Sequence, residues 1–188
     1  MLIYEDEFQL AVTGKNEDVK ISTSELPWPV RTINEDDIEQ VVSVIRESFG
    51  TVADELGFTE ENAPRFTAFA TDAERIGLQL NEEHRPMYGY FDGDRLLGYY
   101  SLSPQEEGMC EINNLCVLPG HRHQKIGELL LLDSFSRSDE SGFAKMNIGI
   151  VEENRTLRAW YEKYGFVHLG TQKFDFFPFT CGYMAREL

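Results

Sequence analysis

The spacing of hydrophobic and polar residues changes several times along the chain, and each change predicts a structural element. From Val30 the short apolar segment VRTI leads to Asn34, a good helix N-cap, with Asp37 three residues later as in a capping box. Apolar residues then recur at the three- and four-residue spacing of a helix, at Ile38, Val41, Val42, Ile45 and Phe49. We expect an amphipathic helix here and a second, weaker helical stretch over residues 59–76.

Further along, two aromatic-rich segments, MYGYF and RLLGYYSL, flank the turn-forming residues Asp92-Gly93-Asp94. Strand-like runs on either side of such a turn predict a β-hairpin. The segment CEINNLCVL alternates enough to predict a half-buried strand that ends at Pro119. Behind it, apolar residues from Ile126 onward, including the run LLLL, predict a buried helix that ends at about Arg137.

The last part of the chain alternates between strand and helix patterns. MNIGIV predicts a strand, and residues 156–164 predict a short helix, because Gly165 stands where a glycine commonly ends one. Two further strands are expected over 167–177 and 181–186. The resulting order, β-αα-β-β-β-α-β-α-β-β, is typical of a mixed α/β domain in which a sheet is layered with helices.

Length and composition fit one globular domain. The chain has 188 residues, of which 41% are hydrophobic, and this is enough to bury a substantial core. Residues 1–29 are acidic and only weakly strand-like, so we expect an N-terminal extension there and the folded domain over 30–188. Acidic residues outnumber basic ones, 33 against 17, for a formal net charge of −16. This charge disfavours nucleic acid and anionic membranes, which bind through Lys and Arg, and favours a neutral or cationic partner.

The cysteines and the N-terminal sequence indicate in which cellular compartment the protein is expected. Three cysteines, Cys110, Cys116 and Cys181, form no CxxC pair, so neither a disulfide framework nor a zinc site is indicated, and we expect reduced thiols in the core. The first residues, MLIYEDEFQL, lack the basic and apolar regions of a signal peptide, and no stretch approaches the roughly 20 apolar residues of a membrane span. The expected location is the cytoplasm.

One basic loop departs from this acidic background. In PGHRHQKIG, residues 119–127, two histidines, an arginine and a lysine fall within five residues, between the predicted strand and the buried helix. Free N–H groups in the first turn of a helix and the positive end of its dipole favour anions, and Arg122 and Lys125 add charge there. The loop therefore predicts a phosphate site. His121 and His123 have no nearby Cys or carboxylate partner, so no metal site is expected.

Two segments resemble motifs of the GNAT superfamily of N-acetyltransferases. Residues 119–130, PGHRHQKIGELL, resemble the Arg/Gln-x-x-Gly-x-Gly/Ala loop with which that superfamily binds the pyrophosphate of acetyl-coenzyme A, except that Lys125 replaces the first glycine. Residues 154–166, NRTLRAWYEKYGF, resemble its later motif of Asn, a short helix and Tyr-Glu-Lys-x-Gly-Phe. The resemblance covers residues 30–188 and implies an α/β acyl-coenzyme A transferase fold, with a single mixed, mostly antiparallel central sheet flanked by helices.

The resemblance also implies how acetyl-coenzyme A, the expected cosubstrate, is held. Gly127 and Arg122 would contact its pyrophosphate, although Gly127 could instead permit close helix–sheet packing and Arg122 could be a solvated charge. Asn154 would hold the coenzyme A arm or simply cap a helix. A backbone N–H of the strand before the loop would polarise the thioester carbonyl. The residues expected to bind the cosubstrate are Cys116, Val117, Leu118, Arg122, His123, Gln124, Lys125, Ile126, Gly127 and Asn154.

Two residues are expected to act in catalysis. The resemblance implies that Tyr161 protonates the leaving coenzyme A thiolate, although its place in an aromatic helical stripe also suits a core tyrosine. Glu111 is the candidate general base, because an amine must lose a proton to attack a thioester; the alternative is an exposed strand carboxylate. Cys110 and Cys116 lack a His–Asp pattern, so we expect no cysteine nucleophile. Candidates to border the acceptor are Asn113, Asn114, Phe176, Phe177 and Tyr183.

Together these features predict an N-acetyltransferase that moves acetyl from acetyl-coenzyme A to a primary amine of a small molecule or peptide, by direct attack in a ternary complex. The expected acceptor is cationic. The alternative from another class is a noncatalytic coenzyme A-binding or regulatory module, which Lys125 in place of glycine leaves open. Charge disfavours a nucleic-acid binder. A homodimer is left open, since residues 1–29 could extend the sheet or cover a partner subunit.

Overall fold

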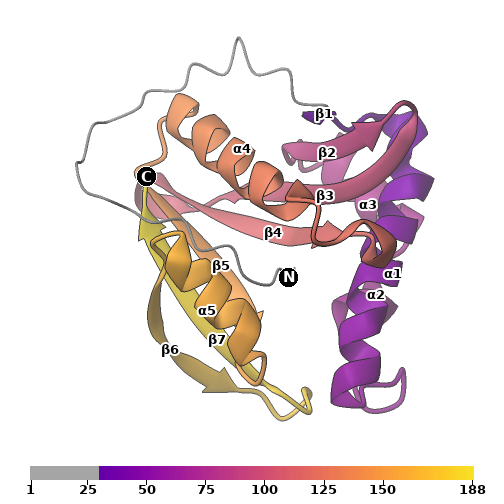
Figure 1. The fold of residues 1–188 in the computed structure, drawn as a ribbon, viewed down its shortest axis with the longest axis vertical. Helices are drawn as coiled ribbons and strands as arrows, with labels where there is room; N and C mark the ends of the chain where they lie inside the picture. The colour runs from indigo at the N-terminus through magenta and orange to yellow at the C-terminus, as the bar shows by residue number, and fades with distance from the viewer. Residues whose placement is uncertain (1–29) are drawn as a thin grey trace.

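The computed structural model of the chain describes residues 30–188, which form a seven-stranded sheet with helices on both faces (Figure 1). The strands are β1 Val30–Thr32, β2 Met87–Asp92, β3 Arg95–Pro104, β4 Met109–Val117, β5 Lys145–Val151, β6 Val167–Lys173 and β7 Thr180–Glu187. Their order is β1-β2-β3-β4-β5-β7-β6, and β4 with β5 is the one parallel pair among these described strands. The expected mixed, mostly antiparallel sheet is confirmed. The expected N-terminal extension lies outside the described residues.

The helices divide between the two faces of the sheet. They are α1 Ile38–Leu56, α2 Thr67–Ala70, α3 Ala73–Asn81, α4 Ile126–Glu140 and α5 Arg155–Lys163. α1 packs against β3 and β4, with α2 and α3 beside it, while α4 covers the same two strands from the opposite face. α5 lies on the α4 side, over β5 and β7 (Figure 1). Within residues 30–188, no helix combines the length and apolar character needed to cross a membrane.

The start of α1 follows the sequence pattern closely. Asn34 caps a short 3-10 turn, and its side chain accepts a hydrogen bond from the Asp36 amide at 2.9 Å. Asp37 returns the interaction by accepting from the Asn34 amide at 3.0 Å, which completes the expected capping box. Arg31 fixes Asp37 with two hydrogen bonds of 2.7 and 2.8 Å. The cap therefore ties the first strand to the beginning of the helix.

The predicted helical stretch over 59–76 is confirmed only in its second half, where it is divided into α2 and α3. Residues 59–66 form turns, in which the Thr59 amide donates to the Asn62 side chain at 2.9 Å, and two short helices follow instead of one. Thr71 is extended between them, and Asp72 starts α3 by accepting from the Arg75 amide at 2.8 Å. Side chains that bond to their own backbone compete with the helix, and these breaks outweigh the weak apolar periodicity.

The final hairpin is shorter on one side than expected. β6 ends at Lys173 rather than at Phe177, because the aromatic run that follows turns back on itself, with the Phe177 amide donating to the Phe174 carbonyl at 3.1 Å. β7 begins at Thr180. The aromatic side chains expected to extend a strand therefore lie on a loop.

Close packing between β3 and α4 requires a glycine. A Cβ atom on Gly98 would lie 2.8 Å from Leu130 Cδ1, 3.0 Å from the Cys116 carbonyl oxygen and 3.2 Å from Ile126 Cγ2. Ile126 begins α4, so the missing side chain lets the first turn of this helix approach the sheet. A Cβ atom on Gly149 of β5, by contrast, would meet nothing within 4 Å.

We predict that Gly98→Ala lowers the free energy of unfolding by about 1–3 kcal/mol, the usual range for an overpacked core site. Gly149→Ala makes the same chemical change in open space and serves as the matched control, with an expected change within about 0.5 kcal/mol. Urea denaturation of both variants measures the difference. Equal losses of stability would contradict the close packing inferred at Gly98.

Candidate functional site

The candidate site lies where β4 and β5 stop pairing. Their parallel ladder joins Met109–Glu111 to Lys145–Asn147 and ends there. Beyond it, Ile112–Val117 pair with β3 and Ile148–Val151 pair with β7, so the two facing edges separate. We call this separation the β4–β5 fork. Its edges direct backbone N–H and C=O groups into the opening, where an extended ligand that carries amides can satisfy them.

A β-bulge in β4 contributes to the separation. The register with β3 shifts so that Asn114 and Leu115 together lie opposite Tyr100. Asn114 has a φ of 52°, in the left-handed region, which asparagine tolerates better than most residues. A bulge bends its strand and redirects the groups that follow it. The end of β4 is thereby turned away from the sheet's regular path at the position where the fork opens.

The sheet restricts which of the expected strand amides can face the fork. The Leu118 amide donates to the Leu97 carbonyl of β3 at 2.9 Å. Successive residues of a strand direct their N–H groups to opposite sides, so the Cys116 amide also faces β3 and the Val117 amide faces the fork. Of Cys116, Val117 and Leu118, Val117 is therefore the residue with an amide suited to a ligand. Burial raises the pKa of the Cys116 thiol to about 11, which keeps it neutral.

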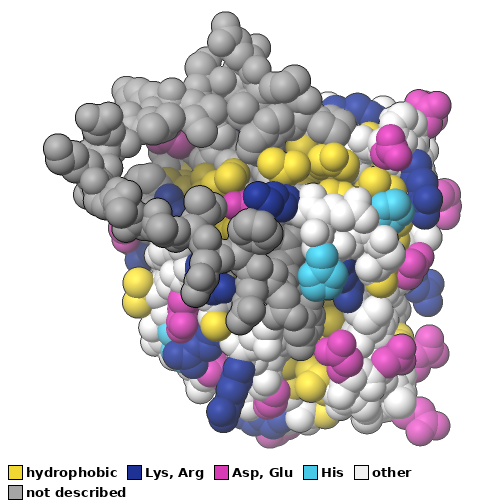
Figure 2. Space-filling view, in the orientation of Figure 1, with side chains coloured by type: hydrophobic (Ala, Val, Ile, Leu, Met, Phe, Trp, Pro, Cys, Tyr) yellow, Lys and Arg dark blue, Asp and Glu magenta, His cyan; other side chains and the backbone are white. Residues whose placement is uncertain are grey.

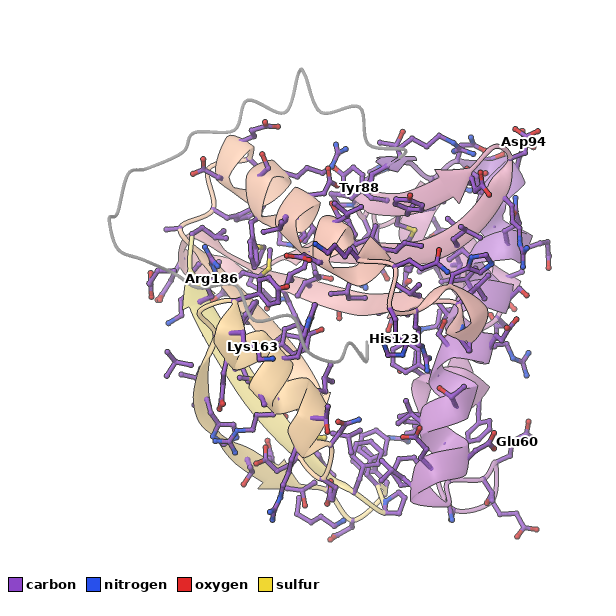
Figure 3. All side chains as sticks on the ribbon, in the orientation of Figure 1. Glu60, Tyr88, Asp94, His123, Lys163 and Arg186 are labelled. Atoms are coloured by element: carbon purple, nitrogen blue, oxygen red, sulfur yellow. The ribbon has the colours of Figure 1, made fainter. Side chains whose placement is uncertain are left out.

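The basic loop leads directly into the first turn of α4. His123 and Lys125 have φ values of 62° and 63°, so Lys125 adopts the left-handed conformation that a glycine would take without strain. In Figure 3, His123 projects away from α4. Within residues 30–188, no acceptor bonds the amides of His123, Gln124, Ile126 or Gly127. Amides of this kind and the positive end of the helix dipole favour anions, and the expected phosphate site here remains a prediction.

Arg122 has a structural role that the sequence did not indicate. Its Nη2 donates to the Ser48 carbonyl and to Thr51 Oγ1 of α1, both at 3.0 Å, and its Nε donates to the Val117 carbonyl at 3.4 Å. The side chain thus joins the end of β4 to α1 across the sheet edge. Its expected contact with phosphate remains a prediction, and it is not the freely solvated charge of the alternative reading.

Tyr161 lies on the α5 side of the fork and is fully buried. Its ring packs edge-on against Phe166, with the centroids 5.3 Å apart, and against Trp160 at 4.9 Å. Its hydroxyl has no hydrogen-bond partner within residues 30–188. Burial, with a smaller contribution from the Cys116 thiol, raises the pKa of Tyr161 and keeps it protonated. A buried hydroxyl without a partner is costly, so its position is explained better by a ligand than by packing alone.

Asn154 takes the position of a helix cap. Its Oδ1 accepts a hydrogen bond from the Leu157 amide at 2.9 Å and so begins α5. The helix ends as expected, with Gly165 at a φ of 83° just beyond it. The second role expected of Asn154, holding the coenzyme A arm, remains a prediction.

Glu111, the last residue of the β4–β5 ladder, lines a cavity of about 200 Å³ on the α1 face of the sheet. We call it the Glu111 cavity. The expected neighbours Asn113, Asn114, Phe177 and Tyr183 line it as well, whereas Phe176 does not. The other lining residues are Arg65, Phe66, Thr67, Ile112, Gly149, Ile150, Phe179 and Cys181. The cavity therefore combines a carboxylate, a guanidinium and several aromatic rings beside the fork.

The Glu111 carboxylate is partly buried and forms no ion pair with another residue of the described range 30–188. Burial raises its pKa, and the positive charge of Arg85 partly opposes that effect. Burial and the nearby charges of Cys181 and Glu111 raise the pKa of Tyr183 as well. A carboxylate with a raised pKa is a better proton acceptor than an exposed one, and shifted pKa values of this kind cluster at functional sites.

Arg65, Phe66, Gly149 and Phe179 were not expected at the site. They come from the turn before α2, from β5 and from the loop after β6, and only the folded chain brings them together. Phe66 and Phe179 contact each other with their ring centroids 5.8 Å apart, and Phe177 stacks on Phe179 at 4.5 Å. No local pattern in the sequence could have indicated these contacts.

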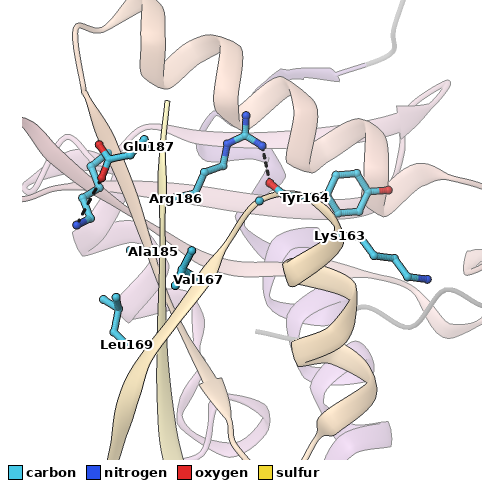
Figure 4. A pocket seen from close by; sticks show the side chains of 9 residues that line it. Lys163, Tyr164, Val167, Leu169, Ala185, Arg186 and Glu187 are labelled. Atoms are coloured by element: carbon cyan, nitrogen blue, oxygen red, sulfur yellow. Dashed lines mark hydrogen bonds and ion pairs between the residues drawn. The ribbon is translucent and has the colours of Figure 1, made fainter. Parts of the chain in front are cut away.

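A larger groove, of about 650 Å³, lies between the end of α5 and β6 (Figure 4). Lys163, Val167, Leu169 and Arg186 are among the residues that line it, and Arg186 donates to the Tyr164 carbonyl. Figure 2 shows Lys and Arg mixed with Asp and Glu over α5. The groove contains none of the residues that face the fork, and no cluster of three metal-binding side chains occurs anywhere in residues 30–188.

Comparison with known proteins identifies a family and a shared fold. A model of the acetyltransferase (GNAT) family matches residues 49–166. No curated protein matches the sequence significantly. Among solved structures, the PaiA N-acetyltransferase from Thermoplasma acidophilum in complex with coenzyme A has a TM-score of 0.72 and 20% identity, over 85% of this chain and 98% of that one.

Two further solved structures share the fold. The ribosomal-protein-alanine N-acetyltransferase from Brucella melitensis has a TM-score of 0.66 and 18% identity, over 85% of this chain and 99% of that one. A GNAT family acetyltransferase from Elizabethkingia anophelis with acetyl-CoA bound has a TM-score of 0.55 and 24% identity, over 62% of this chain and 84% of that one. These similarities confirm the fold.

We predict that Arg122→Gln destabilises the protein even when no ligand is added, because it removes hydrogen bonds from a charged donor to α1. The expected loss in the free energy of unfolding is about 1–3 kcal/mol. Arg46→Gln, at an exposed position on the same helix, removes the same charge and is the control. Urea denaturation measures both. If the two variants lose the same stability, Arg122 does not hold α1 to the loop.

Proposed function

The chain belongs to the acetyltransferase (GNAT) family, and we propose that it transfers acetyl from acetyl-coenzyme A to a primary amine of a small molecule or peptide. Transfer is by direct attack within a ternary complex. The observation that carries the proposal is the β4–β5 fork, with the Glu111 carboxylate where the ladder ends and, on the other face, the Tyr161 hydroxyl, which has no partner among residues 30–188. We also propose a cytoplasmic location, in keeping with cysteines that form no disulfide.

The residues around the fork suit acetyl-coenzyme A, whose thioester supplies an activated acetyl group. The amides at the start of α4, from His123 to Gly127, bind its pyrophosphate, and Lys125 adds positive charge. The separated edges of β4 and β5 bond the amides of its arm. The Val117 amide donates to the thioester carbonyl and stabilises the negative charge that develops there. Coenzyme A bound to the structural neighbour from T. acidophilum supports this assignment.

Glu111 and Tyr161 handle the protons of the transfer. Most amines are protonated at neutral pH, so Glu111, directly or through a water, takes a proton and frees the nitrogen lone pair. The new C–N bond forms as the C–S bond breaks, and Tyr161 donates its proton to the departing sulfur. The nitrogen loses its second proton as the amide forms; that proton restores the Tyr161 hydroxyl through solvent, and Glu111 returns the first proton to bulk water. The raised pKa of Tyr161 suits this role, because the hydroxyl stays protonated until a thiolate develops beside it.

The noncatalytic alternative, a module that binds coenzyme A without transferring acetyl, differs from this proposal in one measurable property. A transferase releases free thiol from acetyl-coenzyme A when an amine is added. Thiol release should therefore be measured with a panel of amines, amino acids, polyamines and peptides, alongside calorimetric binding of coenzyme A. Binding without release for every acceptor would favour the noncatalytic module.

Tyr161→Phe separates the catalytic role from a packing role, because it removes only a hydroxyl that has no partner in the described protein. We expect unfolding stability to be unchanged or higher. Turnover should fall ~10²–10⁴-fold, the usual contribution of a positioned acid or base. Thermal melts and thiol release measure the two effects. Parallel losses of stability and turnover would mean that Tyr161 serves the core.

Glu111→Gln tests the base through stability as well as rate. Burial raises the pKa of Glu111, so the folded protein holds this proton more tightly than the unfolded chain does. This tighter proton binding stabilises the fold fully at pH values below the pKa of Glu111 in the unfolded chain. The stabilisation is lost as the pH rises through the pKa of Glu111 in the folded protein. We therefore expect Glu111→Gln to match wild type in stability in acid and to exceed it near neutral pH.

The rate of the same variant should respond to pH in a characteristic way. Glutamine cannot accept a proton, so turnover depends on the fraction of amine that is already neutral. For an acceptor with a pKa near 10, kcat/KM should rise about tenfold per pH unit from pH 7 to 9, and the deficit against wild type should shrink. Glu60→Gln, at an exposed position far from the fork in Figure 3, is the control. A pH profile parallel to wild type would show that Glu111 is not the base.

A further inference from the structure

The Glu111 cavity contains two opposite charges at different depths. Glu111 comes from the sheet and is partly buried, whereas Arg65 comes from the turn before α2 and is exposed. Among the described residues, Arg85 is the one whose charge opposes the raised pKa of Glu111, and Arg65 is not among the groups that affect it. The cavity thus has an acid at its floor and a separate cation at its mouth.

Arg65 is positioned without being neutralised. Its guanidinium lies over the Phe176 ring, 4.8 Å from the centroid, and this stacking leaves its N–H groups available. No carboxylate within residues 30–188 forms an ion pair with it, even though acidic residues are abundant in this protein. Arginine binds carboxylates well because its planar donors match both oxygens.

The walls between these charges are apolar, and the space is small. Phe179 contacts both Phe66 and Phe177, so rings from two distant segments meet in the lining. A Cβ atom on Gly149 would meet nothing within 4 Å, so the floor beside Glu111 is open. The volume of about 200 Å³ is below the ~300–1,000 Å³ of pockets for drug-sized ligands. One compact acceptor fills such a cavity.

We propose that the acceptor is a small amino-carboxylate with an apolar segment between its two charged ends. Its amine lies at Glu111, its apolar segment lies against the phenylalanine rings, and its carboxylate binds Arg65. This inference rests on the proposed acetyl transfer for the role of the amine. Arg65 disfavours a polyamine, because a second ammonium group at the mouth would meet a like charge.

The test compares two amines of nearly equal basicity that differ in the group at the end of the chain opposite the amine. 6-Aminohexanoate carries a carboxylate where hexylamine carries a methyl group. In the wild type, kcat/KM for 6-aminohexanoate should exceed that for hexylamine and for spermidine. Arg65→Gln should lower the ratio of 6-aminohexanoate to hexylamine at least tenfold, mainly through KM, because the contact is made before and during transfer. Arg75→Gln, at an exposed position on α3, should leave the ratio unchanged.

A binding measurement does not depend on transfer. Hexanoate, which has the carboxylate but no amine, should bind the protein loaded with coenzyme A, and Arg65→Gln should weaken that binding at least tenfold by calorimetry. An unchanged substrate ratio, or hexanoate binding that ignores Arg65, overturns the inference even if hexylamine is acetylated. Conversely, Arg65-dependent binding of hexanoate without thiol release from any amine would overturn the proposed transfer and leave the carboxylate site standing.

Discussion

The end of the β4–β5 ladder at Glu111 is the constraint on which the rest of the site depends. Parallel strands need a crossover, and here the basic loop and α4 provide it. α4 therefore begins just beyond the end of β4, and its first turn follows the basic loop directly. The bulge at Asn114 bends β4 away at the same level. One interruption in pairing thus brings open backbone edges, a helix N-terminus and a carboxylate together.

This arrangement has an energetic cost that the fold must offset. A buried polar group without a partner costs about 1–3 kcal/mol, and the Tyr161 hydroxyl is such a group within the described protein. The raised pKa of Glu111 is a second cost at neutral pH. Arg122, which joins α1 to the end of β4, and Gly98, which lets α4 approach the sheet, act against these costs. The stabilising contacts therefore lie on the elements next to the fork, and the edges of β4 and β5 within it stay unpaired with each other.

Features formed by residues that are close together in the sequence could be predicted from it. The capping box at Asn34, the hairpin at Gly93 and the helix end at Gly165 are local, and the structure confirms them. The helical stretch expected over 59–76 begins late and is divided in two, because side-chain bonds to the backbone interrupt a weak pattern. The Glu111 cavity is lined by four segments that are distant in the sequence, so no local pattern pointed to Arg65. The contact of Arg122 with Ser48 is equally nonlocal.

The net charge of the protein and the individual charges in the cavity act on the acceptor in different ways. The overall charge of −16 acts at long range, where it draws in cations and raises the rate of encounter. In the proposed acceptor site, selection takes place inside the cavity, where screening is weaker and each charge contacts one group of the ligand. There, Glu111 suits an ammonium, while Arg65 suits a carboxylate. An acidic protein can therefore attract amines generally and still, through one arginine, favour those that carry a negative end.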